Sequence, residues 1–332
     1  MTPRAEIDVY ESDLRRQGPL LDILLLDRTS SRIAKKNRNI IWATDSYVTT
    51  GKRCDPFLPT KQIGPGLVTG AYSTLIQPRA AKSKDEQKRR TKDKAEVFTP
   101  LTIVDEMNSA IDRAIGENAP DDHTWQDYIR LLKLEITCGE APYIVSRYDP
   151  TSTVGKLKPI GRRVGFLDKK LDVVNKHTNK QDPDEWFRWV IEAYKASYGY
   201  EWQGDNLLIA RENLLYTFYD YWRAKFGKSD KDLPPMEWRI EIATIISWNI
   251  WQMDGLKYVK PMSCKQTRQE PVSVDKNQTV LFVAEKPKKI MLECEGCRLN
   301  DPLKHTGQKA LIKDWTINGK TGKNVEFVSL LS

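Results

Sequence analysis

The feature that most constrains the fold is a short apolar segment that ends in a tight turn. Five branched apolar side chains predict a buried strand there: Ile129, Leu131, Leu132, Leu134 and Ile136. Cys138-Gly139 predicts a sharp turn, and Pro142 favours the first turn of a following helix, where its missing N–H is not needed. A strand, a small-residue turn and a helix form the first half of a nucleotide-binding βα unit. An ordinary strand–turn–helix of an α/β core is the alternative, because a lone glycine is a weak signal.

The composition restricts the class of protein. A chain of 332 residues with 39% hydrophobic residues can form one large domain or two of ordinary size. It contains no run of about 18 apolar residues, so we expect no membrane span. Its five cysteines, an odd number, favour a reducing cytoplasm over a disulfide-stabilised fold. A net charge of +8 is compatible with a polyanionic partner such as DNA.

A dense cationic run covers residues 82–94. Phosphate contacts need Lys and Arg side chains but no reading of base sequence, so the run is a candidate DNA contact. The residues assigned to that contact are Lys84, Lys88, Arg89, Arg90 and Lys92. A solvated helix face is the alternative interpretation. The run leads into Thr99 and Pro100, which predict the N-cap and first residue of an amphipathic helix.

The chain downstream of the turn contains two more segments in which a strand ends at an acidic residue. Residues 197–201 are β-prone and end at Glu201, and a long amphipathic helix follows over residues 207–221. A helix over residues 236–248 leads into a second such segment, which ends at Asp254. In nucleotide-binding sheets an acid at the end of the second strand accepts hydrogen bonds from ribose hydroxyls. A surface carboxylate at a strand end is the alternative interpretation of Glu201.

Taken in order, four segments resemble the motifs of gamma-type N6-adenine DNA methyltransferases from restriction–modification systems. Residues 95–100 are similar to the upstream motif that ends in Phe-Thr-Pro, and residues 134–143 to the Leu-Glu-x-x-Cys-x-x-x-Pro-Phe form of motif I. Residues 200–201 are similar to motif II, and residues 253–256 to motif III. The resemblance covers residues 80–257, and within the family it looks like the group described as restriction subunit M.

The resemblance implies S-adenosylmethionine as the cofactor. Phe98 and Pro100 would cover the methyl donor. Glu201 would hold the ribose and Asp254 the adenine amino group, while Trp202 would pack on the adenine face. The other implied cofactor contacts are Thr99, Glu135, Cys138, Gly139, Glu140, Pro142 and Gly255.

Two departures from the family bear on mechanism. Glu201 follows Cys138 at about three times the roughly 20-residue distance of a compact βαβ unit, which predicts an insertion with a short helix in the polar residues 149–182. The family's catalytic Asn/Asp/Ser-Pro-Pro-Tyr/Phe motif, which aligns the flipped adenine on the methyl donor, is absent. The nearest string, residues 232–236, has a leucine inside it and lies between two predicted helices. We therefore predict no catalytic residue in this chain.

Cys294 and Cys297 have the Cys-x-x-Cys spacing of a metal site. A closed zinc site needs four ligands, and Cys264 and His305 are the other plausible contributors nearby in sequence. We favour two ordinary thiols and predict no bound metal, with zinc as the alternative. The three histidines lie in polar stretches without a Ser or Cys partner motif, so nucleophilic triad chemistry has little support.

These observations predict an α/β fold with a Rossmann-like methyltransferase sheet that stays incomplete within this chain. We divide the chain into a small N-terminal α+β region (1–80), a cofactor-binding core (81–259) and an irregular basic C-terminal extension (260–332). An incomplete sheet would leave an open edge, and we expect that edge to be an apolar docking surface.

The expected function is the S-adenosylmethionine-binding subunit of a split N6-adenine DNA methyltransferase in a restriction–modification or phage-defence system. The chain is expected to be cytoplasmic and inactive alone. Its expected partners are DNA, a second chain that brings Asn-Pro-Pro-Tyr and target recognition, and a restriction nuclease subunit. The alternatives are a catalytically inactive, methyltransferase-like module that binds DNA or a partner, and a nuclease-side subunit.

Overall fold

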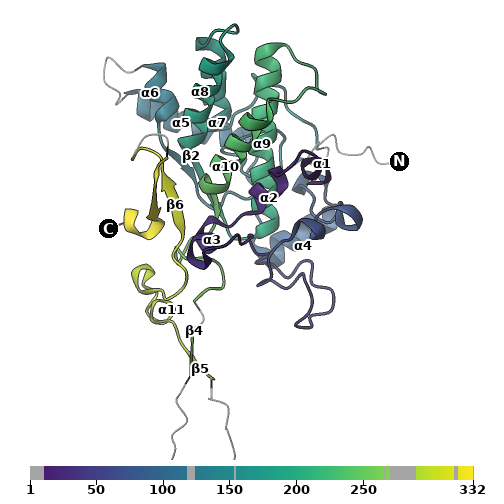
Figure 1. Ribbon diagram of the computed structural model, residues 1–332, viewed down its shortest axis with the longest axis vertical. Coiled ribbons are helices and arrows are strands. Elements are labelled where there is room, and N and C mark those ends of the chain that lie inside the picture. Colours follow the sequence, from purple (N-terminus) through teal and green to yellow (C-terminus); the bar gives the residue numbers. More distant parts are fainter. Residues whose placement is uncertain are drawn as a thin grey trace, which may run out of the picture.

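The computed structural model describes residues 11–117, 124–152, 155–264, 266–269, 289–317 and 321–331. The fold is mixed α/β, built around a three-stranded parallel sheet (Figure 1). The strands are β1 (Lys133–Glu135), β2 (Ser197–Glu201) and β3 (Ile250–Gln252), and they lie in the order β1-β2-β3. The α/β class predicted from the sequence is therefore confirmed. Because the strands are parallel, their carboxyl ends meet at one edge of the sheet.

Four helices connect these strands and pack against the sheet. They are α7 (Phe166–His177), α8 (Pro183–Lys195), α9 (Gly204–Phe226) and α10 (Met236–Asn249). Local sequence sets their ends: the Asp182 side chain caps α8 by accepting a hydrogen bond from the backbone of Glu185, and Gly227 ends α9 in the left-handed conformation, with φ of 63°. The predicted helices over residues 207–221 and 236–248 are confirmed as parts of α9 and α10.

The predicted insertion at residues 149–182 contains a helix of the main core. Leu167, Leu171 and Val174 of α7 are buried in the same apolar cluster as α8 and α9. The long distance between Cys138 and Glu201 thus arises because two core helices, rather than one, connect β1 to β2.

The remaining elements surround this unit. Before the sheet lie α1 (Glu11–Arg16), α2 (Leu20–Leu25), α3 (Arg28–Ala34), α4 (Lys84–Lys94), α5 (Leu101–Glu117) and α6 (Trp125–Arg130). After the sheet come the antiparallel pairs β4 (Gln266–Gln269) with β5 (Lys289–Leu292) and β6 (Leu311–Asp314) with β7 (Lys323–Glu326), and the helix α11 (Glu295–Leu299). Short 3-10 helices cover Pro65–Leu67, Gly70–Tyr72, Arg79–Ala81, Pro302–Lys304 and Phe327–Leu330.

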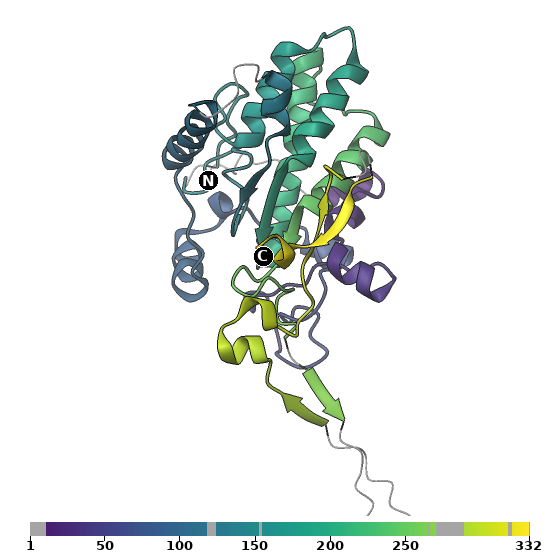
Figure 2. The ribbon, with the colours of Figure 1, turned by 90° about the vertical axis from the view of Figure 1, so that its left-hand side faces the viewer.

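Two apolar clusters lie on opposite faces of the sheet. The larger one contains Ile250 of β3, the inner faces of α7–α10 and apolar residues of α1 and α2, so the described part of the N-terminal region shares the main core. The smaller one joins Tyr198, Tyr200 and Trp251 to residues of the C-terminal β6–β7 pair and Phe327. Figure 2 shows β6 and β7, in yellow, lying against the sheet.

The cover on this second face stops before β1. Leu134 pairs in register with Tyr198, which is 8% exposed, yet Leu134 itself is 42% exposed. The flanking Leu132 and Ile136 are 61% and 65% exposed. Within the described ranges, β1 also has a neighbouring strand on one side only. These three side chains, which we call the β1 stripe, therefore form an uncovered apolar patch beside an open strand edge.

Several local predictions were wrong. Ile129 belongs to α6, so the first strand is shorter than predicted. Pro142 starts a single hydrogen-bonded turn, in which Ala141 accepts from Ile144 and Val145, and the next α-helix among the described residues is α7. The apolar, β-prone residues 39–45 also predict a strand, but they form isolated bridges instead, from Asn39 to Leu26 and from Ile41 to Gln62.

Other expectations are shifted or lie outside the described ranges. Helix α5 begins one residue after Pro100, whose carbonyl accepts the first helical hydrogen bonds, so Thr99 is not its N-cap. The sequence also predicts a strand at residues 279–283, which fall outside the described residues. No helix among the described residues is both long enough and apolar enough to cross a membrane.

Candidate functional site

A cavity of about 760 Å³ lies at the carboxyl ends of β1 and β2. Its walls come from residues 94–99, one face of α5, the start of α7 at Phe166, the strand β1 with the turn after it (132–139, 142 and 143), and residues 201–203 and 206. This volume falls within the range of about 300–1,000 Å³ that is common for small-molecule sites. The cavity lies where open α/β sheets bind their ligands, just outside the carboxyl ends of the strands.

The turn after β1 has an unusual backbone. Thr137, Gly139 and Ala141 adopt positive φ angles of 45°, 54° and 64°. For residues other than glycine this conformation costs about 1–3 kcal/mol each, and it persists only where neighbouring contacts impose it. A side chain at Gly139 would not fit, because its Cβ would lie 2.9 Å from Cε1 of Phe98. The Phe98 ring therefore lies directly over the turn.

Two buried carboxyl groups hold this turn in place. Glu135, at the end of β1, accepts hydrogen bonds from the backbone N–H groups of residues 143 and 144 at 3.3 and 3.1 Å. Glu201, at the end of β2, accepts one from Gly139 at 2.9 Å and one from Gln203 at 3.0 Å. Glu201 thus links the carboxyl ends of β1 and β2 at the cavity wall.

Burial raises the pKa of both carboxyl groups. For Glu201 the pKa reaches about 7, although backbone N–H donors from Gln203 and Gly139 oppose the rise. Burial raises the pKa of Glu135 well above its usual range, and the charge of Glu201 adds to the effect. A bound cation would favour the ionised forms. The chemistry of this wall therefore suits a ligand that carries positive charge and hydroxyl donors.

Most of the predicted cofactor residues line this one cavity. They are Phe98, Thr99, Glu135, Cys138, Gly139, Pro142, Glu201 and Trp202. Four others do not line it: Pro100, Glu140, Asp254 and Gly255.

Glu140 faces away from the cavity into the protein. Its carboxylate accepts hydrogen bonds from the backbone N–H of Arg79 at 2.6 Å and from the Tyr148 hydroxyl at 2.8 Å. Glu140 is 2% exposed, so both of its oxygens are used inside the fold. The prediction that Glu140 lines the pocket is therefore wrong. Glu140 supports the loop beneath the pocket wall.

Asp254 organises the turn that follows β3. Its Oδ1 accepts the backbone N–H groups of Leu256 and Lys257 at 3.0 and 3.2 Å, and its Oδ2 lies 3.8 Å from the Lys257 ammonium. The adjacent Gly255 lies against Tyr200, because a Cβ there would be 2.7 Å from the ring. Both residues lie at the carboxyl end of the sheet but outside the cavity wall.

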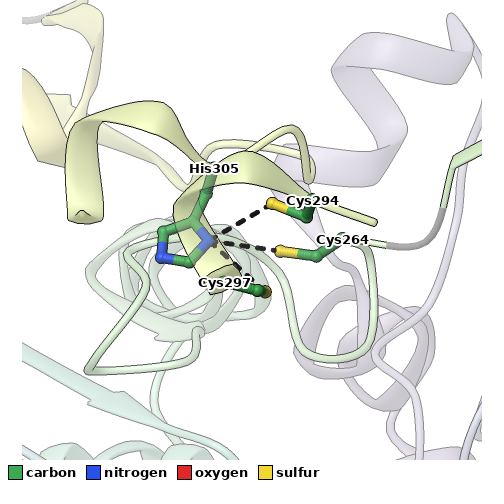
Figure 3. A group of neighbouring side chains, drawn as sticks. All are labelled: Cys264, Cys294, Cys297 and His305. Atoms are coloured by element: carbon green, nitrogen blue, oxygen red, sulfur yellow. Dashed lines mark hydrogen bonds between the residues drawn. The ribbon is translucent and has the colours of Figure 1, made fainter. Parts of the chain in front are cut away.

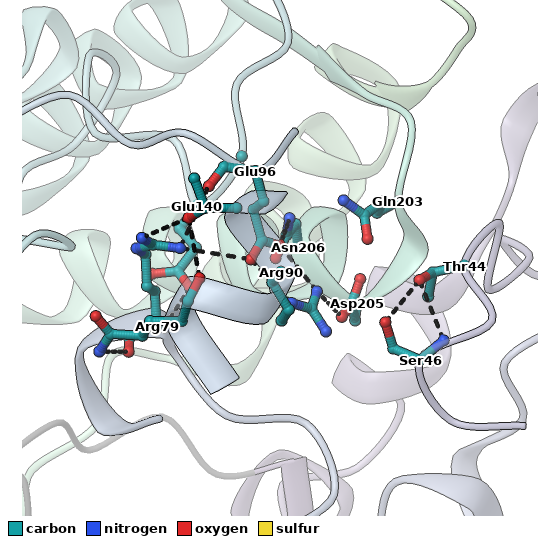
Figure 4. A network of polar contacts seen from close by, with 12 residues as sticks. Thr44, Ser46, Arg79, Arg90, Glu96, Glu140, Gln203, Asp205 and Asn206 are labelled. Atoms are coloured by element: carbon teal, nitrogen blue, oxygen red, sulfur yellow. Dashed lines mark hydrogen bonds and ion pairs between the residues drawn. The ribbon is translucent and has the colours of Figure 1, made fainter. Parts of the chain in front are cut away.

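The cationic segment forms α4, and one of its cations, Arg90, differs from the others in its burial. Arg90 is 1% exposed, with its guanidinium bound to the Glu96 carboxylate through two 2.8 Å hydrogen bonds and to Asp205 through one of 2.6 Å (Figure 4). The assignment of Arg90 to DNA was wrong, because its charge is neutralised inside the fold. The other assigned cations of α4 are exposed: Lys84, Lys88, Arg89 and Lys92.

Three features of the site were not found from the sequence. The guanidinium of Arg79 lies 5.1 Å from the centre of the Phe98 ring and holds it from above. Asn206 lines the cavity and donates to Glu96 at 2.7 Å. The β1 stripe also lines the cavity. The acidic partners of Arg90 lie far apart in the chain, so no local pattern could have revealed this network.

The structure also brings together four side chains for which the sequence favoured ordinary thiols and no bound metal. Cys264, Cys294, Cys297 and His305 place one ligand atom each within 4.8 Å of all the others. This cluster lies beyond β3, in the C-terminal part of the chain, and is separate from the walls of the cavity.

Comparisons with protein-family models, with curated proteins and with solved structures gave no match for this chain.

Proposed function

We propose that this chain is the S-adenosylmethionine-binding subunit of a split N6-adenine DNA methyltransferase, in a restriction–modification or phage-defence system. The proposal starts from the motif resemblance. The observation that carries it is Glu201, at the end of the central parallel strand, bound to the turn that Phe98 covers. In this proposal the sheet is the cofactor-binding half of a Rossmann-like methyltransferase sheet.

The proposed cofactor uses the groups that face the cavity. The Glu201 carboxylate accepts backbone hydrogen bonds from Gly139 and Gln203, and a carboxylate has acceptor positions for about four donors, so a ribose hydroxyl can donate to it as well. The sulfonium and ammonium charges of the cofactor compensate the buried carboxyls of Glu135 and Glu201. Phe98 covers the methyl donor, and Trp202 packs on the adenine. The missing side chain at Gly139 leaves room for the Phe98 ring to close over the turn.

The proposed second chain fits the uncovered part of the sheet. The β1 stripe exposes three large apolar side chains beside a strand edge that has no partner among the described residues. An open apolar edge favours strand addition. A strand added there would place its carboxyl end beside the cavity, where the Asn-Pro-Pro-Tyr motif has to meet the methyl donor. Exposed cations of α4 would contact DNA phosphates without reading sequence.

Calorimetric titration with S-adenosylmethionine tests the cofactor. We expect the wild-type chain to bind, and Glu201→Ala to weaken binding by about 30-fold, the equivalent of roughly 2 kcal/mol for lost hydrogen bonds to a charged group. Glu241→Ala, which changes an exposed carboxylate on α10, is the matched control and should bind as the wild type does. Asp254→Ala should weaken binding less than Glu201→Ala, since Asp254 lies outside the cavity wall. Equal affinities for the wild type and Glu201→Ala would contradict the proposed pocket.

A catalytically inactive binding module is the second candidate. It is favoured by the fact that both oxygens of Glu201 already accept backbone hydrogen bonds and that Phe98 already packs on Gly139. Transfer of a labelled methyl group to DNA separates the two candidates. We expect transfer when this chain is mixed with a neighbouring gene product that carries Asn-Pro-Pro-Tyr, and none from either chain alone. Cofactor binding without transfer by the mixture would favour the inactive module.

A further inference from the structure

A cluster of four metal-ligating side chains lies at the base of the β4–β5 excursion. Figure 3 shows the sulfur atoms of Cys264, Cys294 and Cys297 directed at the imidazole of His305. The three Sγ atoms lie 3.7, 3.5 and 3.7 Å from the same ring nitrogen, Nδ1. Three sulfur atoms and one nitrogen that all lie within 4.8 Å of one another can surround a single metal ion.

These distances match those of tetrahedral zinc. With Zn–S near 2.3 Å and Zn–N near 2.05 Å, tetrahedral geometry places sulfur and nitrogen about 3.6 Å apart. The three observed distances lie within 0.1 Å of that value. Three thiolates and one imidazole form a Cys₃His set, which is a common structural zinc site.

The chain between the ligands is shaped to bring them together. Cys294 is the N-cap of α11 and Cys297 lies within that helix. Gly296 lies between them, and a Cβ there would be 2.5 Å from the backbone nitrogen of His305. The backbone N–H of Thr306 donates to Cys294 Sγ at 3.3 Å. This N–H···S bond is of the kind that supports a thiolate ligand from outside the metal shell.

The residues next to the cluster contribute nothing to the two apolar clusters described above. Neither of these contains a residue of 260–264 or 293–309. Leu299 and Leu303 are 45% and 58% exposed, whereas Cys294 and His305 are 4% and 7% exposed. Cys294 and His305 are thus more deeply buried than the leucines beside them, as expected where a metal replaces a core in a small unit.

A neighbouring cation fits the charge of such a site. Zn²⁺ with three thiolates and a neutral imidazole carries a net charge of −1. The Lys257 ammonium lies within hydrogen-bonding reach of Cys297 and 3.8 Å from Asp254 Oδ2. Lys257 therefore connects the cluster to the turn after β3.

We propose that Cys264, Cys294, Cys297 and His305 bind one structural Zn²⁺ ion. The ion joins the two ends of the chain segment between Cys264 and Cys294 and ties both to His305. Because all four positions around zinc are filled by protein, the site is structural and leaves no position for substrate. This inference does not depend on the proposed methyltransferase function, since none of its ligands lines the cavity.

Metal analysis of the intact chain tests the proposal. The protein is produced with zinc in the medium, purified without chelator and measured by inductively coupled plasma mass spectrometry. We expect one zinc per chain. The double variant Cys294→Ser/Cys297→Ser should contain at least tenfold less zinc than the wild type. Cys54→Ser, which removes an exposed cysteine outside the cluster, should contain as much zinc as the wild type.

A second readout covers the case in which the double variant does not fold. Cobalt added to metal-depleted wild-type protein should give the intense visible absorption of a tetrahedral cobalt–thiolate site. Hydrogen exchange at residues 294–307 should speed up at least tenfold after removal of the metal, with unchanged exchange in α9. A wild-type chain without zinc, an octahedral cobalt spectrum, or a disulfide among these cysteines would each overturn the proposal.

Discussion

The two halves of one face of the central sheet differ in what covers them. Over β2 and β3, the side chains of Tyr198, Tyr200 and Trp251 are buried beneath the C-terminal β6–β7 pair. Over β1, the register neighbour Leu134 is largely uncovered, although it belongs to the same face of the same sheet. Both halves carry large side chains, so the difference lies in whether a described segment of the chain covers them.

This difference separates two roles of the sheet. The covered half is complete and holds Glu201 and the backbone of the turn in fixed positions at the cavity. The uncovered half carries the open strand edge and the β1 stripe along the same cavity. In the proposed function the first half holds the cofactor, and the second receives the chain that completes the catalytic site.

The largest expected effect on stability comes from truncating a large side chain in the covered half of the sheet. The matching truncation in the uncovered half should have a much smaller effect. Trp251→Ala should lower the free energy of unfolding by about 3–5 kcal/mol, because it leaves a cavity among buried rings. Leu134→Ala should lower it by less than about 1 kcal/mol, because the side chain is already partly in water. Urea denaturation of both variants measures the contrast. Similar losses would mean that the β1 half is covered in solution.

The same contrast between covered and uncovered residues exists on α4. Arg90→Ala should cost about 3–5 kcal/mol, because it leaves Glu96 and Asp205 buried without their partner. Arg89→Ala, its exposed neighbour, should stay within about 0.5 kcal/mol of the wild type and weaken DNA binding instead. Thermal unfolding and a DNA-binding titration check both statements. A strong loss of stability in Arg89→Ala would contradict the division of this helix.

A smaller effect, on cofactor affinity, is expected from a change of pH. It arises from Glu201, which lies at the boundary between the two halves. The pKa of Glu201 is raised from 4.5 to about 7, so its carboxyl is mostly protonated at pH 6 and mostly ionised at pH 8. If the ionised form binds the cofactor, affinity should rise about tenfold from pH 6 to pH 8. Calorimetry at several pH values measures this rise, which Glu201→Gln should abolish.

The raised pKa of Glu201 also determines the direction in which the free energy of unfolding changes with pH. Because the folded-state pKa of Glu201 is raised by burial, the stabilising contribution of the protonated carboxyl is complete below pH 4.5 and is lost as the pH rises through 7. The free energy of unfolding should therefore fall over this interval more steeply for the wild type than for Glu201→Gln. The opposite order would show that Glu201 ionises freely in the folded chain.

The smallest expected change in stability is in the uncovered half. Ile136→Lys should change the free energy of unfolding by less than about 0.5 kcal/mol, because Ile136 is 65% exposed. It should reduce concentration-dependent self-association of the chain, which an open apolar edge promotes. Analytical ultracentrifugation measures the association. Ile33→Lys, a matched change at a 52% exposed isoleucine on α3, should leave it unaltered.

The sequence predicted the parts of the fold that depend on local pattern. The strand ending at Glu201, the helices after it and the turn at Gly139 are visible because hydrophobic period and small residues define them over short distances. The helix expected at Pro142 stops after one turn, because the carbonyls of Tyr143 and Ile144 accept hydrogen bonds from the backbone N–H groups of Phe166 and Leu167, at 2.8 and 2.9 Å, instead of from the next helical turn. A local propensity was overridden there by contacts with the distant start of α7.

Features that join distant segments could not be predicted in the same way. Arg90 is buried because Asp205 lies opposite it, and nothing near Arg90 in the chain reveals this partner. The sequence named Cys264 and Cys294 as possible ligands of one metal, but that they meet depends on the antiparallel pairing of β4 with β5, which the spacing of the cysteines does not reveal. From its residue type, Leu134 is expected in the core. It is exposed because no described segment covers it, and the composition of the chain does not reveal which apolar side chains will be covered.

Hydrogen–deuterium exchange with and without S-adenosylmethionine tests the central claim, that the ends of β1 and β2 form a cofactor site. Added cofactor should slow exchange in residues 135–143 and 198–206, which surround Gly139 and Glu201. Exchange in residues 294–307 should stay the same, because the Cys₃His cluster lies apart from the cavity wall. Unchanged exchange around Gly139 and Glu201 at saturating cofactor, or protection found only elsewhere, would contradict the claim.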